Sequence, residues 1–226
     1  MRYLLLFVFS ILCYSTTEAQ DTGGNWLMYF GNHRLNAQWS IHSEVQHRNY
    51  TVAPNNLEQL LLRTGVNYHF ASGNSLTAGY GHITNYAFES AQDGPETTEH
   101  RIWQQFLRAH RLGRLKLEHR VRTEQRFVNA DFKTRYRYRL MGFWPLKAES
   151  LGPGVSYLGL YNEIFVNPTN APWDRNRLFA CLGYQASTHL NFQVGVLRQA
   201  IHSANGWNGN WYVQIGLFLN TPWQTD

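Results

Sequence analysis

The segment 114–139 alternates charged and largely apolar residues with a period of two, and this pattern constrains the fold more than any other feature. Successive side chains of a β-strand point to opposite faces, so a ribbon with this sequence has one ionic and one largely apolar face. A turn at 128–131 divides the segment into two strands. The ionic residues of the two strands are Arg114, Lys116, Glu118, Arg120, Arg122, Glu124 and Arg126, then Lys133, Arg135, Arg137 and Arg139.

Two folds can use such a ribbon. A soluble sandwich would turn the ionic face to water, whereas a membrane barrel would turn the apolar face to lipid and the ionic face to its lumen. The N-terminus favours the second fold. Arg2, an apolar core at 4–12 and the small-residue site Thr17-Glu18-Ala19 have the form of a secretory signal peptide over residues 1–19. We therefore expect cleavage after Ala19 and a single mature domain over 20–226.

The two cysteines have different fates in this scheme. A lipoprotein signal would modify Cys13, but Leu12 stands where a small residue is expected before the modified cysteine. Cleavage after Ala19 removes Cys13 and leaves Cys181 alone, so no intramolecular disulfide is expected.

Composition also fits a membrane barrel. Aromatic residues make up 15% of the chain, including 8 Trp and 13 Tyr, as aromatic girdles at both membrane interfaces would require. The mean hydropathy of −0.42 does not exclude this fold, because only alternate residues of the strands need be apolar. The net charge of +5 is concentrated between Arg101 and Arg139, where ten Arg and two Lys lie. An exported chain is not expected to meet nucleic acid, and strict alternation suits a strand face better than a phosphate-tracking patch.

Eleven strand-like runs are present, separated alternately by tight turns and by longer loops. The runs cover roughly 25–34, 37–50, 57–71, 75–88, 99–112, 114–128, 132–144, 154–167, 175–188, 190–201 and 209–220. Short periplasmic turns and longer outer loops are typical of outer-membrane barrels, which also have an even strand number when both termini are periplasmic. We therefore predict an all-β, antiparallel up-and-down transmembrane β-barrel of about twelve strands, with ten as the alternative. The segment 140–155 is the least clear.

Several short motifs follow one another along nearly the whole mature chain. They are Tyr29-Phe30-Gly31-Asn32 with Arg34, the run 57–63, Glu99-His100-Arg101 with 102–105, Arg120-x-Arg122-x-Glu124-Gln125-Arg126-Phe127, 135–139, 161–167 and Asp174-x-Asn176-Arg177-Leu178. In this order they resemble the uncharacterised outer-membrane β-barrel family called domain of unknown function 2490, from Gram-negative bacteria. The resemblance implies the fold and a location in the bacterial outer membrane, but no activity. The C-terminus departs from barrels generally, because 219–226 follow Phe218 where an aromatic residue usually ends the chain.

This location implies the partners. We expect the lipid bilayer with lipopolysaccharide around the barrel, the barrel-assembly machinery during folding, and small anions as the ligands that an Arg-rich lumen would attract. No cofactor and no metal site is expected, since His and Asp spacing suggests none beyond chance.

The candidate site is a lumenal ion network. Its predicted members, chosen for inward parity, are Glu44, Arg63, Arg108, Glu118, Arg120, Arg122, Glu124, Arg126, Arg135, Arg137, Glu163 and Arg177. Arginine suits this role because its planar fork bridges two carboxylates and stays charged when partly desolvated. The network is either a structural plug that holds the walls in register or a basic eyelet that selects anions, since Arg rings line anion pores.

Three functional hypotheses remain at this stage. The first is a structural or surface-binding barrel with a mostly filled lumen, and the second is a narrow anion-selective channel. The third is a lipid-modifying enzyme on the barrel wall. Its only Ser–His spacing on a convincing strand face is Ser40 with His42, since Ser43 lies on the opposite face from His42.

Overall fold

Eleven strands form almost all of the structure, a computed structural model that describes residues 23–53, 56–168, 171–203 and 206–222. The predicted signal peptide, 1–19, and Cys13 lie outside these residues. The strands are β1 (Gly24–Arg34), β2 (Trp39–Asn49), β3 (Leu57–His69), β4 (Ser75–Asn85), β5 (Thr97–Leu112), β6 (Leu115–Val128), β7 (Asp131–Pro145), β8 (Val155–Asn167), β9 (Ala171–Gln185), β10 (Leu190–Ser203) and β11 (Gly206–Thr221). One 3₁₀ turn, Ala91–Asp93, is the only helix in the described ranges, and no described helix is long and apolar enough to cross a membrane.

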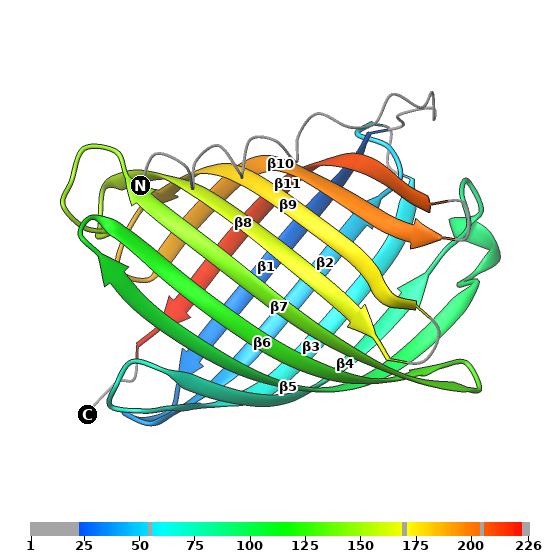
Figure 1. Ribbon diagram of the computed structural model, residues 1–226, viewed down its shortest axis with the longest axis horizontal. Helices are drawn as coiled ribbons and strands as arrows, with labels where there is room; N and C mark the ends of the chain where they lie inside the picture. Colours follow the sequence, from blue (N-terminus) through cyan, green and yellow to red (C-terminus); the bar gives the residue numbers. More distant parts are fainter. Residues whose placement is uncertain (1–22, 54–55, 169–170, 204–205, 223–226) are drawn as a thin grey trace.

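The strands close into a barrel in chain order (Figure 1). Consecutive strands pair antiparallel, and β1 pairs with β11 in parallel, from Gly24 opposite Tyr212 to His33 opposite Thr221. The all-β barrel prediction is confirmed, with eleven strands, between the predicted twelve and its alternative of ten. The number is odd because the closing pair is parallel. The segment 146–154 is a loop and adds no strand.

The barrel has two distinct ends. The Arg34 end is where β1 and β11 finish, and the Gly24 end is where both begin. The Arg34 end carries the connections 35–38, 70–74, 113–114, 146–154 and 186–189, and at the Gly24 end lie the described residues 50–53, 86–96 and 129–130. The tight turns predicted from sequence do share one end. The separation of short from long connections is incomplete, because 146–154 joins the short turns and 129–130 joins the long loops. Furthermore, β9 and β11 begin earlier than expected and shorten two of the predicted loops.

Alternation places one set of side chains in the lumen and the other outside. Glycines make room in the lumen for rings that lie flat on the wall. Trp103 lies against Gly79, where an added Cβ would be 2.6 Å from the indole, and Tyr157 covers Gly183 in the same way. The lumen has an apolar cluster on one side, formed by Trp26, Phe179, Leu197 and Tyr212 with their neighbours, and an ionic network on the other.

The outer face is apolar on every strand. Each strand exposes at least one large apolar side chain, such as Leu62 on β3, Leu158 on β8 and Val194 on β10. Exposed tryptophans lie towards both ends, with Trp39 and Trp144 at the Arg34 end and Trp173 and Trp207 at the Gly24 end. The molecule therefore has many large apolar side chains on its exterior and many charged side chains in its interior.

Candidate functional site

All but one of the predicted network residues lie on the lumenal side. The most deeply buried are Glu44, Arg63, Arg122, Glu124, Arg135, Arg137, Glu163 and Arg177, whereas Glu118, Arg120 and Arg126 are partly buried and paired with acids or with Lys116. The prediction for Arg108 was wrong. On β5 the inward positions are Glu99, Arg101 and Trp103, so Arg108 falls on the outward face with Ile102 and Phe106 and is exposed.

Glu124 is the centre of the network. It is completely buried, and five guanidinium groups come within 4 Å of its carboxylate. Arg135 donates two hydrogen bonds to Oε2, at 2.9 and 2.7 Å, and Arg137 donates one to Oε1 at 2.7 Å. The other three nitrogens, from Arg101, Arg63 and Arg122, lie 3.5, 3.8 and 3.9 Å from Oε1. Because β3 and β6 are separated by two strands around the wall, the Arg63–Glu124 contact crosses the lumen.

Three further carboxylates extend the network across the walls. Glu163 accepts hydrogen bonds from Arg120 at 2.6 Å and from Arg137 at 3.1 and 2.8 Å. Glu44 accepts one from Arg63 at 3.0 Å. Glu99 forms the third branch, with Arg101 at 2.6 Å and with Arg126 at 2.8 and 2.7 Å. Shared arginines therefore link Glu44, Glu124 and Glu163 in one chain, which ties β2 and β3 to β6, β7 and β8.

Aromatic rings fill the space between the charged groups. Phe165 is fully buried, and the guanidinium carbons of Arg137 and Arg177 lie 4.4 and 4.8 Å from its centre. Trp103, also fully buried, stacks against Arg122 at 4.7 Å. Guanidinium groups tolerate such contacts because they are weakly hydrated and attracted to ring faces. Ions and rings together occupy the lumen at the level of Glu124.

Sequence reasoning missed several charged residues of the lumen, of which Glu99 and Arg101 belong to the ion network. Glu99 and Arg101 share the inward parity of β5, which the choice of Arg108 had reversed. Arg48 and Arg175 follow the inward parity of β2 and β9, so alternation could have found them. Glu58 could not be found in this way, because the register shifts where Arg48 pairs with Gln59 and Asn49 with Leu57. That bulge leaves Glu58 unpaired in the ladder, with one carboxylate oxygen buried.

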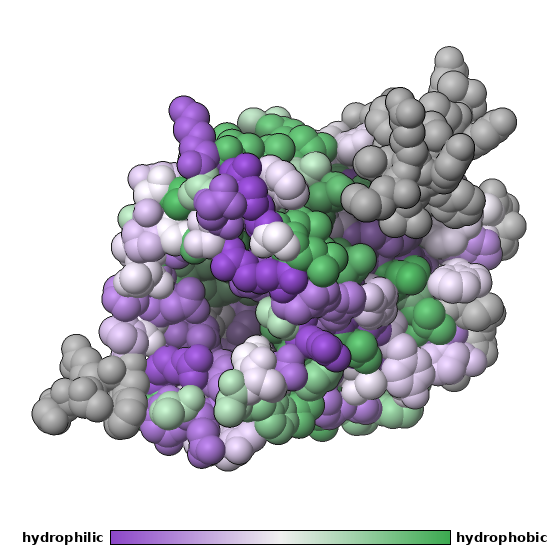
Figure 2. Space-filling model, turned by 60° about the vertical axis from the view of Figure 1, so that its left-hand side comes forward, coloured by the Kyte–Doolittle hydropathy of each residue, from purple (hydrophilic) through white to green (hydrophobic). Residues whose placement is uncertain are grey.

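A cavity of about 470 Å³ lies on the Arg34 side of the ion network. Figure 2 looks toward that end and shows hydrophilic and apolar side chains around a hollow. Its lining includes Arg120, Arg122, Arg139 and Tyr161, but not Glu124, Arg135 or Phe165. The cavity therefore stops at the ion network.

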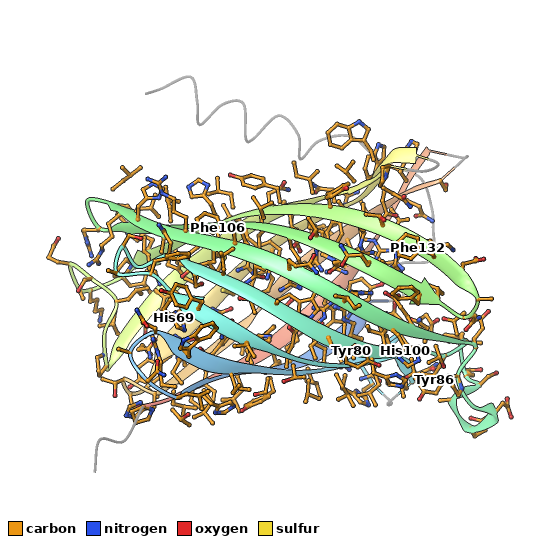
Figure 3. The ribbon with its side chains drawn as sticks, turned by 90° about the horizontal axis from the view of Figure 1, so that it is seen from below. His69, Tyr80, Tyr86, His100, Phe106 and Phe132 are labelled. Carbon is orange, nitrogen blue, oxygen red and sulfur yellow. The ribbon has the colours of Figure 1, made fainter. Side chains whose placement is uncertain are left out.

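The serine–histidine pair predicted from spacing does not form. Ser40 contacts His69, with 2.8 Å between Oγ and Nε2, and donates a hydrogen bond to Asn32 at 2.6 Å. His42 instead lies 3.1 Å from Glu44. The reason is that His69, on the adjacent β3, reaches Ser40 across the ladder, which spacing within one strand cannot reveal; Figure 3 shows His69 near the Arg34 end.

A different pair forms on the outer wall. The distance between Ser43 Oγ and His33 Nε2 is 2.8 Å, and His33 Nδ1 lies 3.1 Å from Thr221 Oγ1. Three strands, β1, β2 and β11, supply these residues. In the described part of the chain, His, Cys, Asp and Glu side chains do not gather in any group of three or more that could hold a metal ion.

Comparison with known proteins gives one match. A family model described as "Protein of unknown function (DUF2490)" matches residues 23–210, which include ten complete strands and the start of β11. Neither the curated proteins nor the solved structures include a match.

Proposed function

Because the chain belongs to the DUF2490 family of proteins of unknown function, its role has to be inferred from its geometry, and we propose that it is an outer-membrane β-barrel with a filled lumen. Its role in this proposal is structural or surface-binding. The observation that carries the proposal is the ion network that crosses the lumen around the completely buried Glu124. Breaking such a network is costly, since a buried charge that loses its partner is not resolvated.

The outer face supports the membrane location. Apolar side chains on every strand would be poorly accommodated by water, and exposed tryptophans towards both ends suit two membrane interfaces. Several outward polar side chains are paired with one another, as hydrocarbon favours. Gln104 hydrogen-bonds Gln125 at 3.2 Å and accepts one from Thr123 at 2.7 Å, and Tyr80 pairs with His100 (Figure 3).

The same network argues against the channel hypothesis, because Glu124 is completely buried among guanidinium groups that reach it from several strands across the lumen. Two measurements test the proposal. One is the conductance of the purified protein in planar bilayers, and the other is fractionation of the cells that express it. We expect the protein in the outer-membrane fraction and no discrete conductance steps. Stable anion-selective steps from wild-type protein would overturn the filled lumen, and recovery of the protein in the cytosol would overturn the location.

A second candidate function, acyl-ester hydrolysis, is favoured by Ser43, His33 and Thr221. Ser43 Oγ would attack the acyl carbon while His33 Nε2 takes its proton, the alcohol would leave with that proton, and water would release the acid. Thr221 would orient the imidazole. The test is turnover of p-nitrophenyl octanoate and phospholipid in micelles. Ser43→Ala should abolish turnover and Ser72→Ala, in an exposed turn, should not; equal rates for wild type and Ser43→Ala would exclude this function.

A further inference from the structure

The cavity at the Arg34 end has two chemically different sides. Strands β6 and β7 contribute Lys116, Arg120, Arg122 and Arg139. Strands β1 and β11, on the opposite side of the eleven-strand ring, contribute Met28, Phe30 and Phe218, and the last two stack with ring centres 4.9 Å apart. The β6–β7 side therefore carries most of the charge, and the β1–β11 side carries apolar and uncharged polar side chains.

The cationic side carries like charges directly opposite one another. In the β6–β7 ladder Arg120 faces Arg139, and Arg122 faces Arg137. Like charges in this position repel unless an anion lies between them. The protein supplies that anion for Arg120 and Arg137, which share Glu163 Oε1, and Gln105 accepts two hydrogen bonds from Arg122 at 3.1 and 2.7 Å.

Arg139 is compensated only at longer range, by Glu163, which lies opposite it in the β7–β8 ladder, and by Glu118. Among the described residues it has no hydrogen-bond acceptor and no carboxylate within ion-pair distance, and its Nε is buried without a partner. Its guanidinium carbon lies 5.5 Å from the centre of the Tyr161 ring. A buried donor without an acceptor is costly, and an anion in the cavity would remove that cost.

The cavity as a whole has an excess of positive charge. Its lining holds eight cationic side chains against the three carboxylates of Glu44, Glu118 and Glu163. The cationic residues are Arg48, Arg63, Lys116, Arg120, Arg122, Arg137, Arg139 and Arg177. A volume of about 470 Å³ is within the range of small-molecule sites, which combine an apolar lining with a few polar groups that fix orientation.

We propose that this cavity binds an amphipathic organic anion. A carboxylate or phosphate head lies against Arg139 and its neighbours Arg120 and Arg122, and the apolar part lies against Met28, Phe30 and Phe218. This inference gives the barrel a ligand class, at the end that carries the predicted tight turns. It rests on the proposed function in one respect: the ion network forms the floor of the site.

The experiment is isothermal titration calorimetry on the full barrel in nanodiscs, with heats from empty nanodiscs subtracted. The probes are octanoate, octyl phosphate, the neutral analogue octanol, and inorganic phosphate. We expect the two amphipathic anions to bind at least tenfold more tightly than octanol and than inorganic phosphate. If octanol binds as well as octanoate, or inorganic phosphate as well as octyl phosphate, the proposal is wrong.

Arg139→Gln provides the residue-level test, because Arg139 belongs to the cavity and not to the Glu124 plug. Binding of octanoate should weaken tenfold or more, whereas Arg108→Gln, on the outward face, should leave it unchanged. Unchanged binding by a folded Arg139→Gln variant overturns the proposal. Nanodiscs of anionic rather than zwitterionic lipid identify the source: weaker octanoate binding there indicates competition by lipid head groups, and unchanged binding indicates a free ligand.

The outcome is separable from that of the proposed function. Conductance in planar bilayers would refute the proposal of a filled lumen. Tight binding that depends on Arg139 would still establish the binding site. If neither conductance nor binding is measured, the proposal of a structural barrel stands and the proposal of a ligand is wrong.

Discussion

At the scale of single residues, the charged side chains of the lumen should differ in how much they stabilise the barrel. Glu124 neutralises several guanidinium groups from different strands. Its removal therefore leaves more than one buried cation without a counter-ion. Arg137 is shared by two carboxylates, whereas Arg139, two residues along the same strand face, has none within ion-pair distance in the described part of the chain. The stability of this barrel should therefore depend on which arginine is replaced, not on how many remain.

Glu124→Gln should destabilise the barrel by ~3–5 kcal/mol, because it leaves buried guanidinium groups without their counter-ion. The measurement is the temperature of the heat-modified gel shift, together with urea unfolding in lipid vesicles. Glu149→Gln is the matched control, since Glu149 is exposed in the loop 146–154 and its contact with Arg114 is 3.8 Å long. Equal stability of the two variants would show that the lumenal charges are solvated.

Arg137→Met and Arg139→Met should have opposite consequences. Loss of Arg137 leaves Glu124 and Glu163 each short of a partner, and we expect a cost of ~3–5 kcal/mol. Loss of Arg139 removes an unpaired buried cation, and we expect unchanged or increased stability. Urea unfolding of both variants in the same vesicles checks this, and a large loss in Arg139→Met would mean that Arg139 has a structural partner.

At the scale of the strand, the two faces differ in burial and in polarity. On β10, Val194 and Val196 point outward and are exposed, whereas Gln193 and Gln199 point inward and are buried. The same alternation on β11 separates Ile215 from Gln214. A change of charge should therefore be judged by the face on which it falls.

Val194→Arg should cost ~2–4 kcal/mol near the membrane midplane, because it puts a charge into lipid. Gln214→Glu, on the lumenal face of the neighbouring strand, should cost less, since the lumen has an excess of guanidinium groups. Unfolding in vesicles of defined thickness compares the two. If both variants lose the same stability, the outer face is not in contact with lipid.

At the scale of the whole molecule, the closing seam decides the topology. Strands β1 and β11 pair in parallel, with Leu27 opposite Ile215 and Trp26 opposite Gln214. An up-and-down barrel closes with a parallel pair only when its strand number is odd, as the eleven strands here require.

A double substitution tests the seam. In a Cys181→Ala background, Leu27→Cys with Ile215→Cys should cross-link in good yield, because these residues are opposite in the register. Leu27→Cys with Leu219→Cys, four residues away along β11, should not cross-link. Non-reducing electrophoresis of the folded barrel reads both, and efficient cross-linking of the second pair would contradict the register.

Local alternation was enough to determine much of this protein. The period of two in 114–139 fixes which side chains share a face, because neighbouring residues of a strand point in opposite directions whatever they pair with. The all-β class, most strand positions and most members of the ion network follow from it. The assignment failed where the inward face of a strand had to be chosen without knowledge of the neighbouring strands. Arg108 was placed on the wrong face of β5, although Glu99 and Arg101 carry the inward parity.

Tertiary structure decided whatever depends on contacts between strands distant in the chain. The parallel pairing of β1 with β11 goes with an odd strand number, which the sequence did not predict. The bulge at Glu58 interrupts the alternation of β3, so alternation could not predict which way this side chain points. The contact of Arg63 with Glu124 exists only because a closed barrel of this width brings β3 and β6 within reach across the lumen. Ser40 meets His69 rather than His42 for a related reason, since cross-strand register, not spacing in sequence, fixes the neighbours of a side chain. The sequence determines which side chains of a strand share a face, and the closed barrel determines which charged groups lie close enough to pair.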